Sequence, residues 1–396
     1  MLRVLTLSTL FPDATRPNFG VFVERQTRGL ADLADTAVAV VAPVGLPPGP
    51  MARLRHAPLV DLPARETWRG MDVHRPRFLA MPFTAGRFHA RALFRAVAPV
   101  LDRLRGSFDV IDASFFFPDG VAAVALGRRY GVPVSIKARG ADIHHWGNAP
   151  ATAAQLLAGG RAADGLLAVS AAMRDDMVAL GMPGTRIRVH HTGVDQDRFA
   201  VADRAAAKAA IGVSGPLVIS TGALIARKGH DVVIEAVATL PGVSLRIAGE
   251  GPERARLDAL IRRLGLGDRV RLLGSVPHDE LPRLLAAADV MALASASEGL
   301  ANAWVEALAC GVPIVVTEAG GAREVVTAPE AGRIAARDSA AFAAAIADLL
   351  ADPPAPEEVR GHAARFTWEA NALALRDHLA GLVRDFGSGA PRHAAA

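Results

Sequence analysis

Two glutamates in the second half of the sequence offer the clearest chemistry. Glu298 and Glu306 are separated by seven residues, the first in a Gly-containing stretch and the second about one turn into a helix expected to begin near Asn302. Asn302 and Glu306 are four residues apart, so they share a helix face beside N–H groups that are free to bind an anion. Two such carboxylates could bind the hydroxyl groups of two sugar rings, although favourable interaction with the helix dipole would also explain Glu306.

A pair of adjacent cations lies upstream of these glutamates. Arg227 and Lys228 come shortly after an apolar run at residues 217–221. Arginine forms forked hydrogen bonds to phosphate oxygens and lysine supplies a compact charge, so the pair suits a diphosphate, whereas a lone Arg-Lys is more often a solvated surface pair. Two further loops follow apolar runs, one containing Glu250 and the other Val276, and they suit backbone contacts to a nucleotide base.

The elements that position these residues are short apolar runs, each followed by a turn and a helical stretch. Such runs predict strands of parallel sheets that are covered on both faces. We therefore expect an α/β protein with two doubly wound, Rossmann-like domains that face a central cleft, with ligands at the carboxyl ends of the strands. The expected strands are residues 4–8, 38–41, 110–113, 134–137, 166–170, 187–190, 217–221, 245–249, 270–274, 290–293 and 314–317.

The chain length of 396 residues fits two domains. The predicted division is an N-terminal domain at residues 1–195, a C-terminal domain at 196–365, a helix at 366–386 that returns to the first domain, and a flexible tail at 387–396. The boundary after Asp195 is placed where the sequence becomes polar and Ala-rich.

Composition limits the environment and the partners. The single cysteine, Cys310, excludes an intrachain disulfide and favours a reducing compartment. No stretch approaches the roughly 18 uninterrupted apolar residues of a membrane span. Residues 1–195 carry an excess of seven positive charges and residues 196–396 an excess of three negative charges. This asymmetry favours an anionic partner for the first half, such as a membrane surface or an acidic glycan. Nucleic acid is not expected, since no recognition motif accompanies the charge.

The order of the motifs resembles glycosyltransferase family 4, a large family of retaining enzymes with the GT-B fold, also known as the group 1 glycosyltransferases. The resemblance covers nearly the whole chain. It implies that residues 1–195 form the acceptor-side domain and that residues 196–365 form the nucleotide-sugar-binding domain. It extends to the first half through residues 11–12, 18–24, 139–142, 168–170, 192–195 and 199, besides the motifs of the second half.

The resemblance implies a role for each matching residue. Glu306 would bind the donor ribose and Glu298 the hydroxyls of the donor sugar, while Arg227 and Lys228 would bind the diphosphate. The other donor-binding residues would be Gly20, Glu250, Val276, Leu300, Ala301 and Asn302.

The family pattern often has His-Gly-x-Asp where this chain has Arg139-Gly140-Ala141-Asp142. Arg139 could replace the histidine as a cation, or His144 or His145 could take over its role. Arg139, Asp142, His144 and Glu298 are thus the predicted catalytic residues.

The similarity also implies that no metal or other cofactor is required and that a nucleotide-diphosphate sugar is the co-substrate. Asp195-Gln196-Asp197 has the Asp-x-Asp pattern of metal-dependent transferases, but it falls in the interdomain link. The His144-His145 and His190-His191 pairs lack further ligands at zinc spacing.

The resemblance also implies that the acceptor is a glycan or a lipid-linked glycan of cell-surface polysaccharide biosynthesis. Residues 53–105 hold eleven arginines against four acids. An anionic membrane surface is therefore a candidate partner, and the expected location is the cytoplasm, with peripheral association at the inner face of the membrane. The alternatives are a sugar-nucleotide epimerase, a phosphorylase or a non-catalytic nucleotide-sugar-binding protein.

Overall fold

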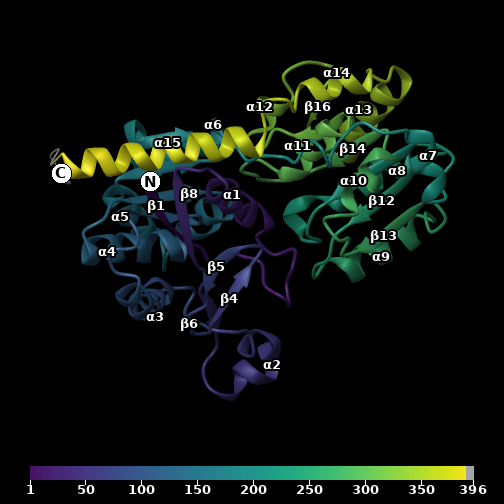
Figure 1. Cartoon of the computed structure of the whole chain (residues 1–396). Coiled ribbons are helices and arrows are strands. Elements are labelled where there is room, and N and C mark those ends of the chain that lie inside the picture. The colour runs from purple at the N-terminus through teal and green to yellow at the C-terminus, as the bar shows by residue number, and fades with distance from the viewer. Residues whose placement is uncertain (389–396) are drawn as a thin grey trace. The chain divides into compact units, whose positions relative to one another are not determined.

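The computed structural model describes residues 1–388, which fold into two units (Figure 1). The first unit comprises Met1–Gly193 and the chain from Trp368 onward, and the second comprises Val194–Thr367. Of the tail expected at residues 387–396, residues 389–396 lie outside the described part of the chain.

The first unit is built around an eight-stranded sheet with the order β10-β9-β8-β7-β1-β2-β5-β4. All neighbouring strands in it are parallel except β4 and β5. The separate strands β3 and β6 form a parallel pair. The strands are β1 (Leu2–Leu7), β2 (Thr36–Val41), β3 (Val44–Leu46), β4 (Arg65–Trp68), β5 (Met71–His74), β6 (Arg77–Leu79), β7 (Val110–Ala113), β8 (Val134–Ala138), β9 (Gly165–Ala168) and β10 (Ile187–Val189).

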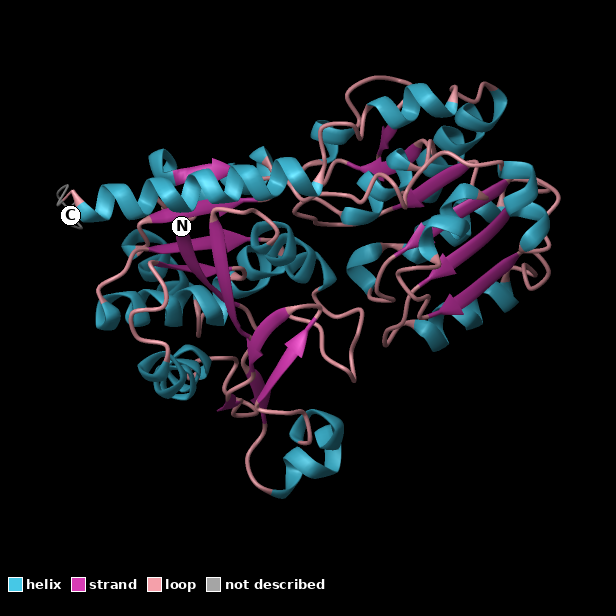
Figure 2. Ribbon diagram, in the orientation of Figure 1, coloured by secondary structure: helices cyan, strands magenta, loops and turns pink. Residues whose placement is uncertain are grey.

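The helices of this unit connect the strands. They are α1 (Val21–Ala31), α2 (Pro50–Val60), α3 (His89–Arg103), α4 (Val121–Tyr130), α5 (Ala153–Ala162), α6 (Ala171–Ala179) and α15 (Trp368–Gly387), with the short turns η1 (Phe116–Gly120), η2 (Asp142–Trp146) and η3 (Gly184–Arg186). Figure 2 shows helices flanking the strands in each unit, which is the arrangement that strands buried on both faces require.

The second unit has one six-stranded parallel sheet with the order β13-β12-β11-β14-β15-β16. Its strands are β11 (Leu217–Thr221), β12 (Ser244–Ala248), β13 (Val270–Gly274), β14 (Val290–Leu293), β15 (Ile314–Thr317) and β16 (Gly332–Ala335). Its helices are α7 (Arg204–Ala210), η4 (Ala226–Lys228), α8 (His230–Ala238), α9 (Arg254–Arg263), α10 (Leu281–Ala286), α11 (Asn302–Ala309), α12 (Ala322–Val325), α13 (Ser339–Ala351) and α14 (Pro356–Gly361).

The α/β fold with parallel sheets is confirmed, and each of the eleven expected runs forms a strand. The prediction missed β3, β4, β5, β6 and β16. The strands missed in the first unit are only three or four residues long, and β4 carries Arg65 and Glu66, so they lack the apolar run on which the prediction depended. No helix within residues 1–388 is long and apolar enough to cross a membrane.

The last helix, α15, belongs to the first unit although it follows the second unit in the sequence. It packs on α1, β7 and β8, and its Leu375 and Leu379 share a hydrophobic core with Val4. Two buried histidines add polar contacts to this packing. His378 Nε2 lies 3.0 Å from Ser135 Oγ on β8, and His190 Nε2 lies 2.9 Å from the carbonyl oxygen of Asn371.

We expect His378 to make the stability of the first unit sensitive to acid. Burial lowers the pKa of His378 to about 4, whereas an unfolded histidine has a pKa of about 6.5. The unfolded state therefore takes up a proton first as the pH falls, so the stability contribution is complete above about pH 6.5 and is lost towards pH 4. In urea unfolding, wild type should lose about 2 kcal/mol more free energy of unfolding than His378→Gln between about pH 7.5 and about pH 5.

The control for this comparison is His145→Gln, because His145 is an exposed histidine of the same unit. It should leave the pH dependence of unfolding unchanged. Equal pH dependence in wild type and His378→Gln would contradict the assignment.

Candidate functional site

Glu298 lies in the loop between β14 and α11 and is almost fully buried. Its Oε1 accepts a hydrogen bond from Ser295 Oγ at 2.6 Å and lies 2.5 Å from Lys228 Nζ. Its Oε2 lies 3.6 Å from Arg227 Nη1. A carboxylate in a nearly dry site is stable only when it is paired and hydrogen-bonded, and these three side chains provide that environment.

The two cations come from the η4 turn that follows β11. Arg227 Nη1 also donates to the carbonyl oxygen of Ser297, and the amide of Ala296 donates to the carbonyl oxygen of Arg227 at 2.8 Å. Gly229 ends the turn with φ 65°, and a Cβ there would lie 2.1 Å from the carbonyl oxygen of Ala294. Only glycine permits so close an approach, so this residue allows the cation turn and the Glu298 loop to touch.

Glu306 has a different partner. It is one turn into α11, which begins at Asn302 as the sequence predicts. Its Oε1 lies 2.9 Å from Nε2 of His278, in the loop after β13. The His278 ring in turn packs edge-on against Phe199 at a centroid distance of 5.4 Å. Sequence reasoning missed His278, although it predicted a ligand loop two residues earlier at Val276.

The remaining residues predicted to bind the donor lie on the same loops. Leu300 and Ala301 are buried immediately before α11, and no side chain in the described part of the chain caps the first N–H groups of this helix. Glu250 is exposed after β12, and its carbonyl oxygen accepts from the amide of Leu224 at 2.9 Å. Val276 is half-buried.

In the first unit, Asp142 is a buried carboxylate held by backbone amides. Its oxygens accept from the N–H groups of Arg139, Gly140, Ile143 and Phe116 at 2.8 to 3.2 Å. Burial raises the pKa of Asp142, and these amides oppose that rise. The hydrogen bonds join the loops that follow β7 and β8, so they hold these two loops together within the unit.

Arg139 is directed inward by this arrangement. Its Nε donates to the carbonyl oxygen of Ser114 at 2.6 Å, its Nη2 donates to Gln26 Oε1 at 3.2 Å, and its guanidinium lies 4.9 Å from the centre of the Phe22 ring. Burial lowers the pKa of Arg139 to about 10, so it remains a cation at neutral pH. The neighbouring Lys137 is fully buried, and burial together with the charge of Arg139 lowers its pKa well below the usual value.

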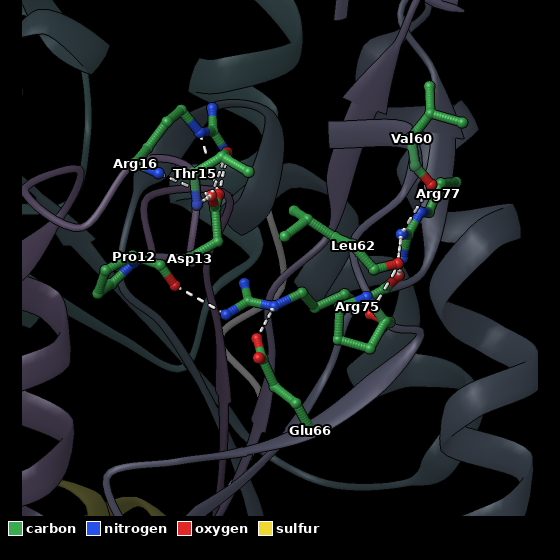
Figure 3. Close-up of polar contacts among 10 residues, drawn as sticks. Pro12, Asp13, Thr15, Arg16, Val60, Leu62, Glu66, Arg75 and Arg77 are labelled. Atoms are coloured by element: carbon green, nitrogen blue, oxygen red, sulfur yellow. Dashed lines mark hydrogen bonds and ion pairs between the residues drawn. The ribbon is translucent and has the colours of Figure 1, made fainter. Parts of the chain in front are cut away.

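The loop between β1 and α1 is braced by two ion pairs, which Figure 3 shows with the chain segments they join. Asp13 accepts from the backbone and hydroxyl of Thr15 and from Arg16, whose Nη2 lies 2.7 Å away. Arg75 donates to the carbonyl oxygen of Pro12 at 2.7 Å and pairs with Glu66. The loop ends at Gly20, where φ is 70° and a Cβ would lie 2.5 Å from the backbone of Leu10. Gly20 is therefore required by the path of the loop.

His144 has a different partner from those of Arg139. Its Nε2 is 2.8 Å from Asp176 Oδ2, and it is half-buried. The structure thus brings Arg227, Lys228 and Glu298 together, joins Asp142 to the backbone of Arg139, and places Glu306 beside His278. Among residues 1–388, no group of three His, Cys, Asp or Glu side chains could hold a metal ion.

Comparisons with known proteins connect this geometry to a family. Residues 202–366 match the family model of the glycosyl transferases group 1, and residues 20–198 match that of Glycosyltransferase Family 4. A GDP-mannose-dependent α-(1-6)-phosphatidylinositol monomannoside mannosyltransferase of Mycolicibacterium smegmatis is 32% identical over 273 residues, which are 65% of this chain and 72% of that protein. The chain belongs to glycosyltransferase family 4.

Other similar proteins agree with this glycosyltransferase assignment. A D-inositol 3-phosphate glycosyltransferase of Mycolicibacterium smegmatis is 34% identical over 221 residues, which are 53% of this glycosyltransferase and 51% of that protein. Sucrose-phosphate synthase from Thermosynechococcus elongatus superimposes with a TM-score of 0.81 at 21% identity, covering 97% of this chain and 100% of that chain. Anabaena HepE in complex with UDP and glucose gives 0.75 at 22% identity, covering 96% and 100%. These two structures show that the fold of the glycosyltransferase is GT-B.

We expect Lys228→Met to destabilise the second unit because it leaves the buried Glu298 carboxylate with fewer partners. The loss should be about 3 kcal/mol in the free energy of unfolding. Adding Glu298→Gln should recover more than about 1 kcal/mol of it, since the uncompensated charge is then removed. Denaturant unfolding of the single and double variants measures this coupling.

Arg323→Met is the matched control, because Arg323 pairs with Glu318 at an exposed site. It should leave the stability of the second unit nearly unchanged, because solvent screens an exposed ion pair. If the Lys228→Met protein is as stable as this control, the ion pair between Lys228 and Glu298 does not stabilise the site.

Proposed function

We propose that this glycosyltransferase moves a hexose-type sugar from a nucleoside-diphosphate sugar to a glycan or lipid-linked acceptor, with retention at the anomeric carbon and without a metal ion. The observation that carries the proposal is the contact of Arg227 and Lys228 with Glu298 beside the uncapped start of α11. This places two cations and a set of free N–H groups next to a carboxylate that is suited to sugar hydroxyls.

The internal contacts leave hydrogen-bond donors for a ligand. Lysine has three N–H donors and arginine has five, whereas Lys228 uses one on Glu298 and Arg227 uses Nη1 on Ser297 and Glu298. The remaining donors can stabilise the negative charge that develops on a diphosphate leaving group. The same cations and helix N-terminus supply the charge for which other transferases use a metal ion.

Glu298 is better suited to binding than to nucleophilic attack. Its carboxylate is buried between a lysine, an arginine and a serine hydroxyl, which stabilise its negative charge and reduce its reactivity. Retention by a covalent glycosyl-enzyme would need a free carboxylate as nucleophile. We therefore propose that the acceptor attacks the anomeric carbon from the same face that the nucleoside diphosphate leaves. The leaving phosphate would help to take the acceptor proton, which is the mechanism usually described for similar enzymes.

Glu306 is the proposed ligand of the donor ribose. His278 occupies its Oε1 at 2.9 Å and so fixes the orientation of the carboxylate. The other oxygen can then accept hydrogen bonds from vicinal hydroxyls. Gly20, Glu250, Val276, Leu300, Ala301 and Asn302 complete the proposed donor-binding residues, and Arg139, Asp142 and His144 the proposed catalytic set of the first unit.

We propose the cytoplasm as the location, with an anionic membrane surface as a further partner. The observation that supports the membrane partner is the excess of arginine in residues 53–105. One relative acts on a phosphatidylinositol mannoside according to its name, which supports a lipid-linked acceptor in cell-surface polysaccharide or glycolipid synthesis. The test of the activity is a panel of nucleotide sugars, including GDP-mannose and UDP-glucose, screened for nucleotide release with a pool of lipid-linked glycans.

We expect activity to persist in excess chelator. The cationic side chains at η4 and the N–H groups of α11 stabilise the leaving group without a metal. The measurement is the rate of nucleotide release with and without EDTA after dialysis. Complete loss that Mg²⁺ or Mn²⁺ restores would refute the metal-independent mechanism.

We also expect the two glutamates to be separable by ligand binding. Glu306→Gln should weaken binding of the free nucleotide and of the intact donor, by about tenfold each, because the ribose contact is common to both. Glu298→Gln should spare the free nucleotide and weaken the intact donor. Calorimetry with both ligands measures this, and an identical pattern in the two variants would show that the division of roles is wrong.

A further inference from the structure

The turn between β6 and α3, residues 80–88, combines an unusual backbone with an unusual side chain. We call it the Phe83 turn. Phe83 has φ 60°, Ala85 has φ 46° and Gly86 has φ 81°. Of the non-glycine residues with positive φ in the described part of the chain, only Arg69 lies outside this turn. Left-handed backbone is unfavourable for a bulky residue, so such outliers indicate a function when the structure enforces them.

The surrounding structure does enforce this conformation. Thr84 Oγ1 donates to the carbonyl oxygen of Met81 at 2.9 Å, and the amide of Arg87 donates to the carbonyl oxygen of Thr84 at 3.0 Å. Gln155 on α5 donates to the carbonyl oxygen of Arg87 at 3.1 Å. A Cβ at Gly86 would lie 2.7 Å from the Trp146 ring, so the base of the turn is packed tightly.

The side chain at the tip of the turn is not buried by other parts of the protein, so hydrophobic burial does not stabilise the turn there. Phe83 is 104% exposed and Phe88 is 50% exposed. Leu79 and Met81, on the approach to the turn, are 46% and 36% exposed. A turn that is held in an unfavourable conformation and presents its phenylalanine fully to water indicates an apolar partner outside the chain.

Unpaired cations lie next to this apolar surface. Arg87, Arg91 and Arg95 are exposed, and no acidic side chain within residues 1–388 forms an ion pair with them. Arg91 and Arg95 are four residues apart on α3, so they lie on one face of that helix. By contrast, Arg65 and Arg75 of the same region are paired with Asp72 and Glu66.

The apolar surface continues from the turn along β6. A hollow of about 650 Å³ beside β3, β6 and α2 has Leu79 in its wall, together with Leu46, Pro48, Val60 and Phe78. Arg53 also lines it. The hollow and the Phe83 turn therefore both present apolar side chains with arginines beside them.

We propose that the Phe83 turn inserts into an anionic lipid bilayer, with Phe83 and Phe88 at the level of the acyl chains and Arg87, Arg91 and Arg95 on the headgroups. This inference specifies which residues would contact the membrane surface that is proposed above as a partner, and it rests on that proposed function. A phenylalanine with arginine neighbours has the composition of interfacial membrane anchors, in which apolar burial and attraction to anionic lipid act together.

The first test replaces the apolar tip without disturbing the fold. Asparagine tolerates φ near 60° better than phenylalanine, so Phe83→Asn should keep or raise the thermal stability. Its partition onto vesicles of phosphatidylcholine and phosphatidylglycerol should fall about tenfold. Val178→Asn is the matched control, because Val178 is an exposed apolar residue elsewhere in the same unit, and it should bind as wild type does. Co-sedimentation measures the partition.

The second test concerns the charges. Changing Arg87, Arg91 and Arg95 together to Gln should reduce binding to anionic vesicles at low salt by a factor of about five per residue. High salt should reduce wild-type binding and should have little further effect on this variant. The triple change of Arg262, Arg263 and Arg271 to Gln removes three exposed charges from the second unit and should leave vesicle binding unchanged.

The third test reports insertion directly. Cys310 is buried, and burial raises the pKa of its thiol to about 12, so the native chain has little reactive thiol at neutral pH. Phe83→Cys can therefore be labelled at one site with a polarity-sensitive dye. The emission should shift to the blue on anionic vesicles, whereas the same dye on Val178→Cys should not respond.

The outcomes separate this inference from the proposed enzymatic function. Loss of vesicle binding in Phe83→Asn, with calorimetric binding of UDP or GDP unchanged, supports the inference. Wild-type vesicle binding by Phe83→Asn, or no binding of anionic vesicles by wild type at low salt, overturns it and leaves the transferase proposal intact. A concentration-dependent dimer that Phe83→Asn abolishes would also overturn it, because the turn would then contact a second copy. Vesicle binding without any nucleotide binding would refute the proposed function instead.

Discussion

The parallel pairing of continuous apolar strands is the constraint on which the rest of this structure depends. A parallel strand can be followed by another only through a crossover, so helices cover both faces of each sheet and the loops at the carboxyl ends of the strands all lie at one edge. A polar side chain in these loops is not forced into the apolar layers that cover the sheet. In the second unit, the turn after β11 supplies Arg227 and Lys228, and the loop after β14 supplies Glu298.

The charges at the two sheet edges are stabilised in different ways. In the second unit, a carboxylate meets two cations directly, and its partners keep donors for an anionic ligand. In the first unit, Lys137 Nζ lies 2.9 Å from Gln26 Oε1 and 2.8 Å from His190 Nδ1, while Asp142 relies on backbone amides. Burial raises the pKa of Asp119 to about 7 and that of Asp112 to about 6. Lys137 and Asp142 are thus held by neutral partners, which fixes the loops around Arg139 in one arrangement.

The sequence was sufficient for the α/β fold and for the strand-end loops on which the candidate site residues lie, because apolar runs and the loops that follow them are local patterns. It predicted eleven of the strands, the start of α11 at Asn302 and the position of the cation pair after β11. It could not reveal that His278 contacts Glu306, since the two residues are 28 positions apart and meet only after β13 and α11 are placed. Nor could the sequence reveal that four backbone amides surround the Asp142 carboxylate, because the Phe116 amide comes from a separate loop. The Phe83 turn was missed altogether. It is recognised by a positive φ angle and by the exposure of its phenylalanine, and neither property can be predicted from the sequence.

The position of α15 has a consequence for synthesis of the chain. Val194 and Thr367 form a β-bridge, so the two connections between the units lie side by side and the whole second unit is an insertion within the first. On the ribosome, the second unit has all of its residues before α15 emerges. The first unit, although its strands are made earliest, must wait with Leu30 and Val110 uncovered until Leu375 and Leu379 arrive to complete that core. The first unit can therefore be completed only after the whole second unit has been made, so its sheet has the longer exposure to aggregation.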